Sequence, residues 1–182
     1  MRRFFASLLE IVEIAIVAVG AVFLIRTFLI QPFLVSGASM VPTFADGDYL
    51  LIDQITYRFR EPERGEVVVF RSPSDESTYF IKRIIGLPGE TVTIKNGAIT
   101  IANEANKKGF KLEESYIPQN VATRGDESFV LGPNGYLLLG DNRSYSFDSR
   151  SWGALEKDKI VGLVRLRLWP ITELTAFAAP TY

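Results

Sequence analysis

The chain has 182 residues, of which 47% are hydrophobic and 23% are charged, and its formal net charge is −1. This balance provides no basic surface for a polyanion, so we expect no nucleic-acid partner. Because cysteine and histidine are both absent, disulfides, thiolate and imidazole metal sites, a Ser-His-Asp triad and a Cys-His pair are all excluded.

The N-terminus carries an excess of apolar sequence. Arg2 and Arg3 precede an uninterrupted apolar run over 14–25, which resumes after Arg26 and ends at Ile30. Twelve helical residues rise only about 18 Å, less than the hydrocarbon core of about 30 Å. If Arg26 reaches the far interface, residues 14–30 supply about 25 Å, and local thinning of the bilayer covers the rest. We therefore predict a single transmembrane helix within residues 1–30.

Two other interpretations of this N-terminal segment stay open. A secretory signal peptide has the same basic start, but the small residues over 36–38 lie thirteen residues beyond residue 25, too far for a cleavage site. A buried core helix is the other alternative, because the run is of borderline length. In the membrane interpretation Arg2 and Arg3 keep the N-terminus in the cytoplasm. Glu10 and Glu13 share a helix face, and their role is left open.

Beyond Gln31 and Pro32 the sequence changes to short β-rich runs separated by Gly, Pro, Asp and Asn. The clearest run is 91–101, where two alternating segments meet at Asn96-Gly97, the composition of a tight β-hairpin. We predict an all-β domain of antiparallel sheets over 31–170. The predicted strands are 48–53, 55–59, 66–71, 78–85, 91–94, 98–101, 129–131, 136–139 and 159–169.

A polar stretch over 102–127 interrupts these strands. We interpret it as a surface excursion of the same domain, in which Tyr116 and Ile117 pack back onto the body. Residues 171–182 form a C-terminal tail in this scheme.

Without histidine, a serine nucleophile would need another base, and lysine is the leading candidate. The period of two along the strand over 79–85 places Phe80, Lys82 and Ile84 on one face and Arg83 on the other. An amine between two apolar neighbours loses solvation, which lowers its pKa toward the range of a general base. The alternative is that Lys82 and Arg83 are an ordinary surface pair on a half-buried strand.

A third polar segment, 140–153, follows the apolar run over 136–139. Asp148 and Arg150 can form an ion pair, Asp141 and Asn142 can cap turns, and a serine hydroxyl can orient a neutral lysine. The alternative is a well-tied surface loop.

Taken in order and spacing, these segments resemble the type I (leader) signal peptidases, a family of membrane-anchored serine-lysine endopeptidases. The resemblance covers residues 14–169 and rests on 26–33 (RTFLIQPF), 39–43 (SMVPT), 47–48 (GD), 82–89 (KRIIGLPG) and 140–153 (GDNRSYSFDSRSWG). It implies that Ser39 is the nucleophile, that Lys82 is the general base and that Ser146 positions the lysine amine. Asp148 and Arg150 would buttress the loop as an ion pair, with Asp141 as a further support, and no metal or cofactor would be needed.

The resemblance also implies the substrate and the location. The substrates would be exported preproteins cut after a small residue, at a bacterial cytoplasmic membrane, with the N-terminus cytoplasmic, the catalytic domain extracytoplasmic and the lipid bilayer as a second partner. The pocket for the residue before the cut would be walled by Met40, Phe44, Phe80 and Ile81. The pocket for a second small residue, two positions before that one in the substrate, would be walled by Phe33, Val35 and Ile81.

One position departs from part of the family. Gram-negative members place an oxyanion-binding serine two residues before the nucleophile, whereas this chain has Gly37 there, as Gram-positive members do. The Ser39 amide would be one oxyanion donor, and the second donor stays open, as does the oligomeric state. Two other functions fit the sequence less well: a membrane-tethered scaffold, which intact Ser39, Lys82 and Ser146 disfavour, and a self-cleaving repressor, which would need a DNA-binding helix-turn-helix.

Overall fold

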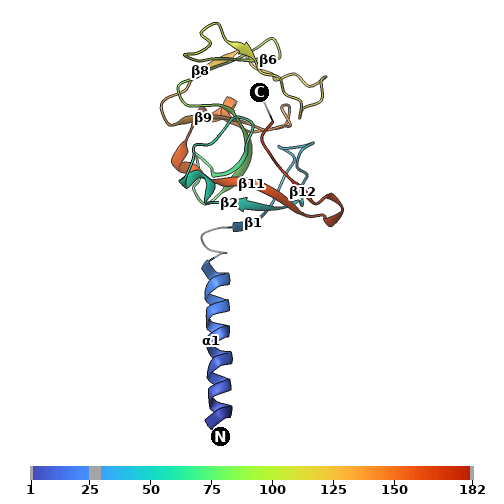
Figure 1. Ribbon diagram of the computed structural model, residues 1–182. Helices are drawn as coiled ribbons and strands as arrows, with labels where there is room; N and C mark the ends of the chain where they lie inside the picture. Colours follow the sequence, from blue (N-terminus) through green and yellow to red (C-terminus); the bar gives the residue numbers. More distant parts are fainter. Residues whose placement is uncertain (1, 25–29, 181–182) are drawn as a thin grey trace.

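The computed structural model describes residues 2–24 and 30–180 (Figure 1). Its helices are α1 (Arg2–Leu24) and α2 (Ser149–Trp152), with short 3-10 turns η2 (Thr56–Arg58), η3 (Lys157–Lys159) and η4 (Ile171–Glu173). Its strands are β1 (Ile30–Leu34), β2 (Tyr49–Asp53), β3 (Val67–Arg71), β4 (Tyr79–Gly86), β5 (Thr91–Lys95), β6 (Ala98–Ala102), β7 (Phe110–Lys111), β8 (Glu127–Val130), β9 (Gly135–Leu139), β10 (Leu155–Glu156), β11 (Ile160–Trp169) and β12 (Thr175–Ala176).

The N-terminal helix α1 extends away from the β-domain (Figure 1). Over the part of the chain that is described, no helix combines the length and the hydrophobicity needed to cross a membrane. The predicted helix over 14–30 is therefore not found in that form. Helix α1 ends at Leu24, part of the predicted segment lies outside the described residues, and Ile30 already belongs to β1, where it pairs with Asp53 of β2.

The β-domain is built on two antiparallel sheets, which confirms the predicted all-β class. The larger sheet has the order β1-β2-β11-β3-β4-β9-β10, with β12 also paired to β11. The smaller sheet has the order β7-β6-β5-β8. Its central hairpin turns at Asn96 and Gly97, whose φ angles of 52° and 80° match the turn that the Asn-Gly pair predicted.

The predicted strand over 55–59 is wrong, because η2 occupies this segment. The carboxylate of Asp53 accepts hydrogen bonds from the Ile55 and Thr56 amides at 2.9 and 3.0 Å, and Ile55 in turn accepts a bond from Arg58. An aspartate that bonds the next backbone amides favours a turn over an extended strand. The other predicted strands are found with small shifts at their ends; the largest shift places β8 at Glu127–Val130 instead of 129–131.

Strand β4 connects the hydrophobic cores of the domain. Three clusters of buried residues lie on and between the sheets, and β4 contributes Ile85 to one, packs Ile81 against the second, and contributes Ile84 to the third. Fully burying one isoleucine side chain contributes about 1.5–3 kcal/mol. The strand that carries Lys82 is thus held in place by packing on both faces.

The excursion over 102–127 returns to the body of the domain at two points. Ile117 is buried, and the ring of Tyr116 lies under the guanidinium of Arg83, 3.9 Å from ring centroid to Cζ. Glu114 of the same segment pairs with the buried Arg143. These contacts tie the excursion to the loop that follows β9.

Candidate active site

Ser39 lies in a tight loop between β1 and β2. The ends of this loop are joined by hydrogen bonds from Val35 to the Asp48 carbonyl (2.9 Å) and from Gly47 to the Val35 carbonyl (3.0 Å). Gly37 has a φ of +96°, a conformation that favours glycine, and its amide donates to Asp46 Oδ1 at 2.7 Å. The glycine at this position is therefore required by the shape of the loop.

Lys82 lies on β4 beside Ser39. It is only 3% exposed, and its Nζ makes 2.8 Å hydrogen bonds to Ser39 Oγ and to the Ile81 carbonyl oxygen. Burial lowers the pKa of Lys82 from its ordinary value of 10.5 to about 8, although the negative charges of Asp148 and Asp141 act in the opposite direction. The structure thus joins a hydroxyl to an amine that loses its proton near pH 8.

Asp141 secures the opposite face of the same strand. Its two oxygens accept hydrogen bonds from Arg83 Nε at 2.8 Å and Nη2 at 2.6 Å, and Thr43 donates to it at 2.5 Å. Thr43 belongs to the loop that carries Ser39. One buried carboxylate therefore links the strand that carries Lys82 to the loop that carries Ser39.

Ser146 lies close to Ser39 but forms no hydrogen bond with Ser39 or Lys82. Its Oγ is buried and, among the described residues, has no hydrogen-bond partner. A Cβ added to Gly140 would collide with Ser146 Oγ and would lie 2.5 Å from the Ser39 carbonyl oxygen. The Ser146 hydroxyl and the Ser39 carbonyl oxygen therefore both lie next to Gly140. The hydrogen bond between Ser146 and the Lys82 amine that the resemblance implies is not formed.

Asp148 and Arg150 form the ion pair expected for this loop. Arg150 Nε and Nη2 each donate to Asp148 at 2.8 Å, and the Gly140 amide donates at 3.1 Å. Burial alone would raise the pKa of Asp148, but these hydrogen bonds and the positive charge of Arg150 hold that pKa below its ordinary value of 3.8. The aspartate stays ionised and fixes the start of the loop against α2.

A small pocket of about 120 Å³ opens next to Ser39 and Lys82. Of the residues predicted to bind substrate, Phe33, Val35, Phe80 and Ile81 line it, together with Ser36, Ser39 and Lys82. Met40 and Phe44 do not line this pocket. They lie in the buried cluster that also contains Val35, and Phe44 contacts the ring of Phe177 at 4.5 Å between centroids.

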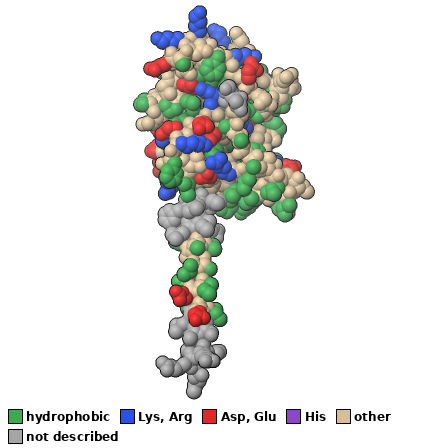
Figure 2. Space-filling model, viewed as in Figure 1, with side chains coloured by type: hydrophobic (Ala, Val, Ile, Leu, Met, Phe, Trp, Pro, Cys, Tyr) green, Lys and Arg blue, Asp and Glu red, His purple; other side chains and the backbone are tan. Residues whose placement is uncertain are grey.

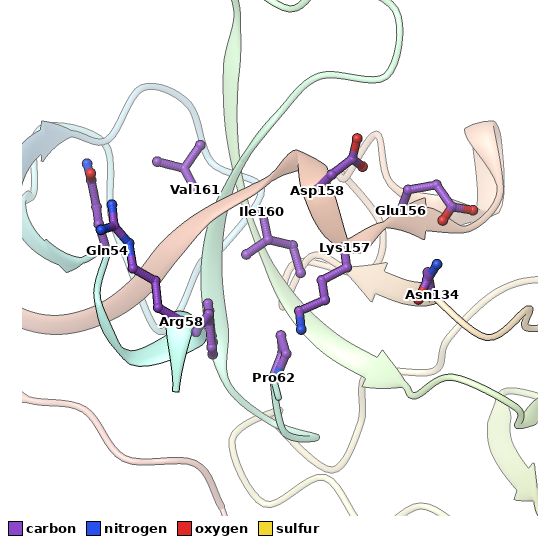
Figure 3. A pocket seen from close by; sticks show the side chains of 10 residues that line it. Gln54, Arg58, Pro62, Asn134, Glu156, Lys157, Asp158, Ile160 and Val161 are labelled. Atoms are coloured by element: carbon purple, nitrogen blue, oxygen red, sulfur yellow. The ribbon is translucent and has the colours of Figure 1, made fainter. Parts of the chain in front are cut away.

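Two of the wider hollows in the described part of the chain lie away from these residues. One of about 680 Å³ is shown in Figure 3, where Lys157 projects toward Pro62. The other, of about 720 Å³, includes the exposed Phe59. Neither is lined by a residue predicted for the site. Chemistry, not size, therefore identifies the small pocket as the candidate active site.

The structure shows supporting contacts that the sequence did not predict, including contacts of Asn142, which was expected only to cap a turn. Asn142 donates from Nδ2 to the Ala38 carbonyl at 2.9 Å, and its own amide donates to the Ser39 carbonyl at 3.0 Å. Thr43 joins the Asp141 cluster, and Arg143 bonds the Gly140 carbonyl at 3.0 Å. For Asn142 and Arg143 the sequence signal was the density of polar residues over 140–153, whereas Thr43 lies in the 39–43 segment.

Comparisons with known proteins identify the family of this chain. A family profile described as "Signal peptidase, peptidase S26" matches residues 8–169. The chain is 39% identical over 171 residues to a probable signal peptidase I-2 of Synechocystis, covering 88% of this chain and 71% of that protein. It is 33% identical over 178 residues to signal peptidase IB of Staphylococcus aureus, covering 92% of each. A crystal structure of a signal peptidase I from Enterococcus faecalis V583 superposes with a TM-score of 0.48 and 28% identity, over 57% of this chain and 97% of that one.

Proposed function

The chain belongs to the signal peptidase family, peptidase S26, and from this membership we propose that it works through a dyad in which Ser39 is the nucleophile and Lys82 the general base. Its activity is that of a serine endopeptidase that removes signal peptides from preproteins. The observation that carries the dyad assignment is the 2.8 Å contact between Lys82 Nζ and Ser39 Oγ, made by a lysine that is almost fully buried.

The protonation state of Lys82 decides whether it can act. With a pKa of about 8, about half of the Lys82 amines are neutral at pH 8, against about one in three hundred for a lysine at 10.5. A neutral amine that donates one hydrogen to the Ile81 carbonyl can turn its lone pair toward the Ser39 hydroxyl. Burial thus converts an ordinary cation into a base.

The reaction then follows in two steps. Lys82 takes the Ser39 proton as Oγ attacks the scissile carbonyl, and the resulting ammonium protonates the leaving amine. A water molecule activated by the same lysine hydrolyses the ester that is left on Ser39. The Ser39 amide donates a hydrogen bond to the oxyanion, and Ser36, a residue of the same pocket, is a candidate for the second donor.

Substrate binding uses an open strand edge next to the pocket. Residues 79–82 of β4 pair with β3, whereas the ladder with β9 begins only at Arg83, so within the described chain one edge of this segment has no strand partner. An extended preprotein segment adds there, as peptides add to exposed sheet edges. Phe33, Val35, Phe80 and Ile81 then limit the side chains near the cut to small ones. Met40 and Phe44 support this wall from the core beneath.

Ser146, Asp148, Arg150 and Asp141 act as supports. The Asp148–Arg150 pair holds the loop that places the Ser146 hydroxyl next to Gly140 and the Ser39 carbonyl oxygen. Asp141 fixes the neighbouring Arg83. In this scheme Ser146 receives the amine during turnover, not in the resting enzyme.

The assignment is tested by incubating the detergent-solubilised protein with a preprotein and mapping the new N-terminus. Cleavage after a small residue that disappears in Ser39→Ala supports the proposal. Cleavage that persists in Ser39→Ala would show that another group is the nucleophile.

Apolar surface at two places supports attachment to a lipid bilayer. Along α1, Ile14, Val19 and Phe23 are between 63% and 70% exposed. On the β-domain, Leu34, Tyr49 and Trp169 are exposed and lie side by side, since Tyr49 pairs with the other two across β1 and β11. Figure 2 shows hydrophobic side chains gathered at the end of the β-domain nearest α1. Contiguous exposed apolar surface of this kind is typical of an interaction site.

In the proposed arrangement the N-terminal region, residues 1–30, holds the enzyme at the bacterial cytoplasmic membrane with its N-terminus inside. The catalytic β-domain, residues 31–170, then lies on the extracytoplasmic side, and Arg2 and Arg3 bias the orientation. Protease added outside intact spheroplasts should digest the β-domain. Full protection of that domain, with a periplasmic marker digested in the same sample, would refute this orientation.

A further inference from the structure

Asn142 binds both peptide units that flank the nucleophile. Its side-chain Nδ2 donates to the Ala38 carbonyl oxygen at 2.9 Å, and its backbone amide donates to the Ser39 carbonyl oxygen at 3.0 Å. The Ala38 oxygen can only accept, so the chemistry of the contact requires that the NH₂ group of Asn142 face it. A single residue thus holds the chain on both sides of Ser39.

The contact to Ala38 controls the direction of the Ser39 amide. The Ala38 carbonyl and the Ser39 N–H belong to the same peptide unit, which is planar, so fixing the oxygen fixes the line along which the N–H points. Within the described residues, the Ser39 N–H donates no hydrogen bond to the protein. It is therefore available to the substrate, in a direction that Asn142 sets.

Asn142 is well suited to this role because both of its neighbours are anchored. Asp141 is held by two hydrogen bonds from Arg83 and one from Thr43. Arg143 is buried, bonds the Gly140 carbonyl at 3.0 Å and pairs with Glu114. The backbone on each side of Asn142 is thus fixed by ionic contacts, and its carboxamide extends from a rigid support.

We propose that Asn142 is a positioning residue for oxyanion binding, acting through the Ser39 amide. The inference rests on the proposed function, in which Ser39 is the nucleophile. When Ser39 Oγ attacks, negative charge develops on the former carbonyl oxygen of the substrate, and an oxyanion donor must lie 2.7–3.1 Å from it. Donation from Asn142 to the other end of the peptide unit both aims that N–H and polarises it, since hydrogen bonds in a chain strengthen one another.

The test compares Asn142→Ala and Asn142→Ser with wild type on a short peptide substrate. Both variants remove the carboxamide and keep the backbone bond from residue 142 to Ser39. Direct loss of an oxyanion donor costs about 10²–10³ in kcat, so misdirecting one is expected to lower kcat by about 10- to 100-fold. We expect KM to stay within about twofold and the ascending limb of the pH profile to keep its midpoint, because Lys82 is untouched. Asn120→Ala, on the exposed part of the excursion, is the matched control and should behave as wild type.

Several outcomes would overturn the inference. A rise in KM with kcat unchanged would mean that Asn142 shapes the substrate pocket. A midpoint that moves together with kcat would mean that it acts on Lys82. Wild-type kinetics in both variants, or loss of the native circular dichroism spectrum in both, would also end it. Failure of the underlying function is recognised separately, because Ser39→Ala would then stay active in the same assay.

Discussion

Lys82 and Arg83 are neighbours on β4, and both are nearly buried, with exposed fractions of 3% and 4%. On one face of the strand, the Lys82 amine bonds a hydroxyl and a carbonyl, both uncharged. On the other face, the Arg83 guanidinium bonds both oxygens of Asp141 and the Gly65 carbonyl, and it lies over the ring of Tyr116. Two buried cations one residue apart therefore have opposite surroundings.

The comparison shows how one strand can supply both a base and a support. A buried charge costs several kcal/mol unless a counter-ion and hydrogen bonds compensate it. Arginine keeps its proton at any usable pH, so Arg83 requires Asp141. Lysine can lose its proton instead, and Lys82, without a direct carboxylate contact among the described residues, does so near pH 8. The alternation of side chains along β4 separates the two outcomes.

The largest expected effect comes from removing either member of the dyad. Ser39→Ala and Lys82→Ala should each lower kcat/KM by at least about 10⁴-fold, because nucleophile and base act as a unit. Lys82→Arg should be as inactive as Lys82→Ala, since a guanidinium does not deprotonate. Peptide cleavage is the measurement, with circular dichroism to verify folding. Appreciable turnover by the arginine variant would exclude Lys82 as the base.

Breaking the Arg83–Asp141 pair, on the opposite face of β4 from Lys82, should instead lower the stability of the fold. Asp141→Asn keeps the shape of the side chain but leaves the Arg83 charge buried without its carboxylate, which is expected to lower the free energy of unfolding by about 3–5 kcal/mol. Urea unfolding of the full chain in detergent measures the change. The control is Glu76→Gln, which removes an exposed pair with Lys159 and should leave the midpoint unchanged. Equal midpoints for the two variants would contradict the structural role of the Arg83–Asp141 pair.

Replacing the lysine by an apolar residue should have the reverse effect on stability. The pKa of Lys82 is about 8 in the folded protein and 10.5 in the unfolded chain, so the unfolded chain binds this proton more tightly. Lys82 therefore destabilises the fold by about 3 kcal/mol below pH 8, and this cost fades as the pH rises toward 10.5.

Lys82→Met should accordingly be inactive but more stable than wild type at pH 7, with a difference that shrinks as the pH is raised from 8 to 10. Urea unfolding at a series of pH values measures it, and Ser39→Ala serves as an inactive control that keeps the lysine. A Lys82→Met protein less stable than Ser39→Ala at pH 7 would mean that Lys82 is not strained by burial.

The smallest expected change concerns the apolar cover of the amine. Phe80→Ser should let water reach Lys82 and move the ascending limb of kcat/KM to higher pH. The Phe80 ring lies 5.6 Å from Nζ and so also favours the charged amine, but burial is the dominant influence on this pKa. A limb that stays in place would mean that Phe80 does not desolvate Lys82. Phe59→Ser, at a highly exposed phenylalanine, is the matched control.

Most strands could be predicted from the sequence because their patterns are local. The alternation in β4 and β5 and the Asn96-Gly97 turn are set by neighbouring residues. The same alternation anticipated the desolvated face of Lys82. The segment over 55–59 failed for an equally local reason, since β-branched and aromatic residues suggested a strand while the side chain of Asp53 bonded the next amides and formed a turn.

The long-range supporting contacts of the site could not be predicted in this way, in contrast to the local Asp148–Arg150 pair. Arg83 and Asp141 are 58 residues apart in the chain, and Asn142 and Ala38 are 104 apart. Their contacts depend on how β4 and β9 pair and on where the loop after β9 meets the loop after β1. The sequence showed that residues 140–153 are polar, but not which groups in distant segments they would bind.

The pH dependence of kcat/KM for the wild-type enzyme on a short peptide tests the central claim most directly, because in the free enzyme it reports the pKa of the group that must lose a proton. If Lys82 is the base and burial sets its pKa, activity should rise with pH through a midpoint near 8. An ascending limb centred near 10.5 would mean that the lysine is solvated in the working enzyme, and a profile that is flat from pH 6 to 10 would mean that no lysine acts as the base.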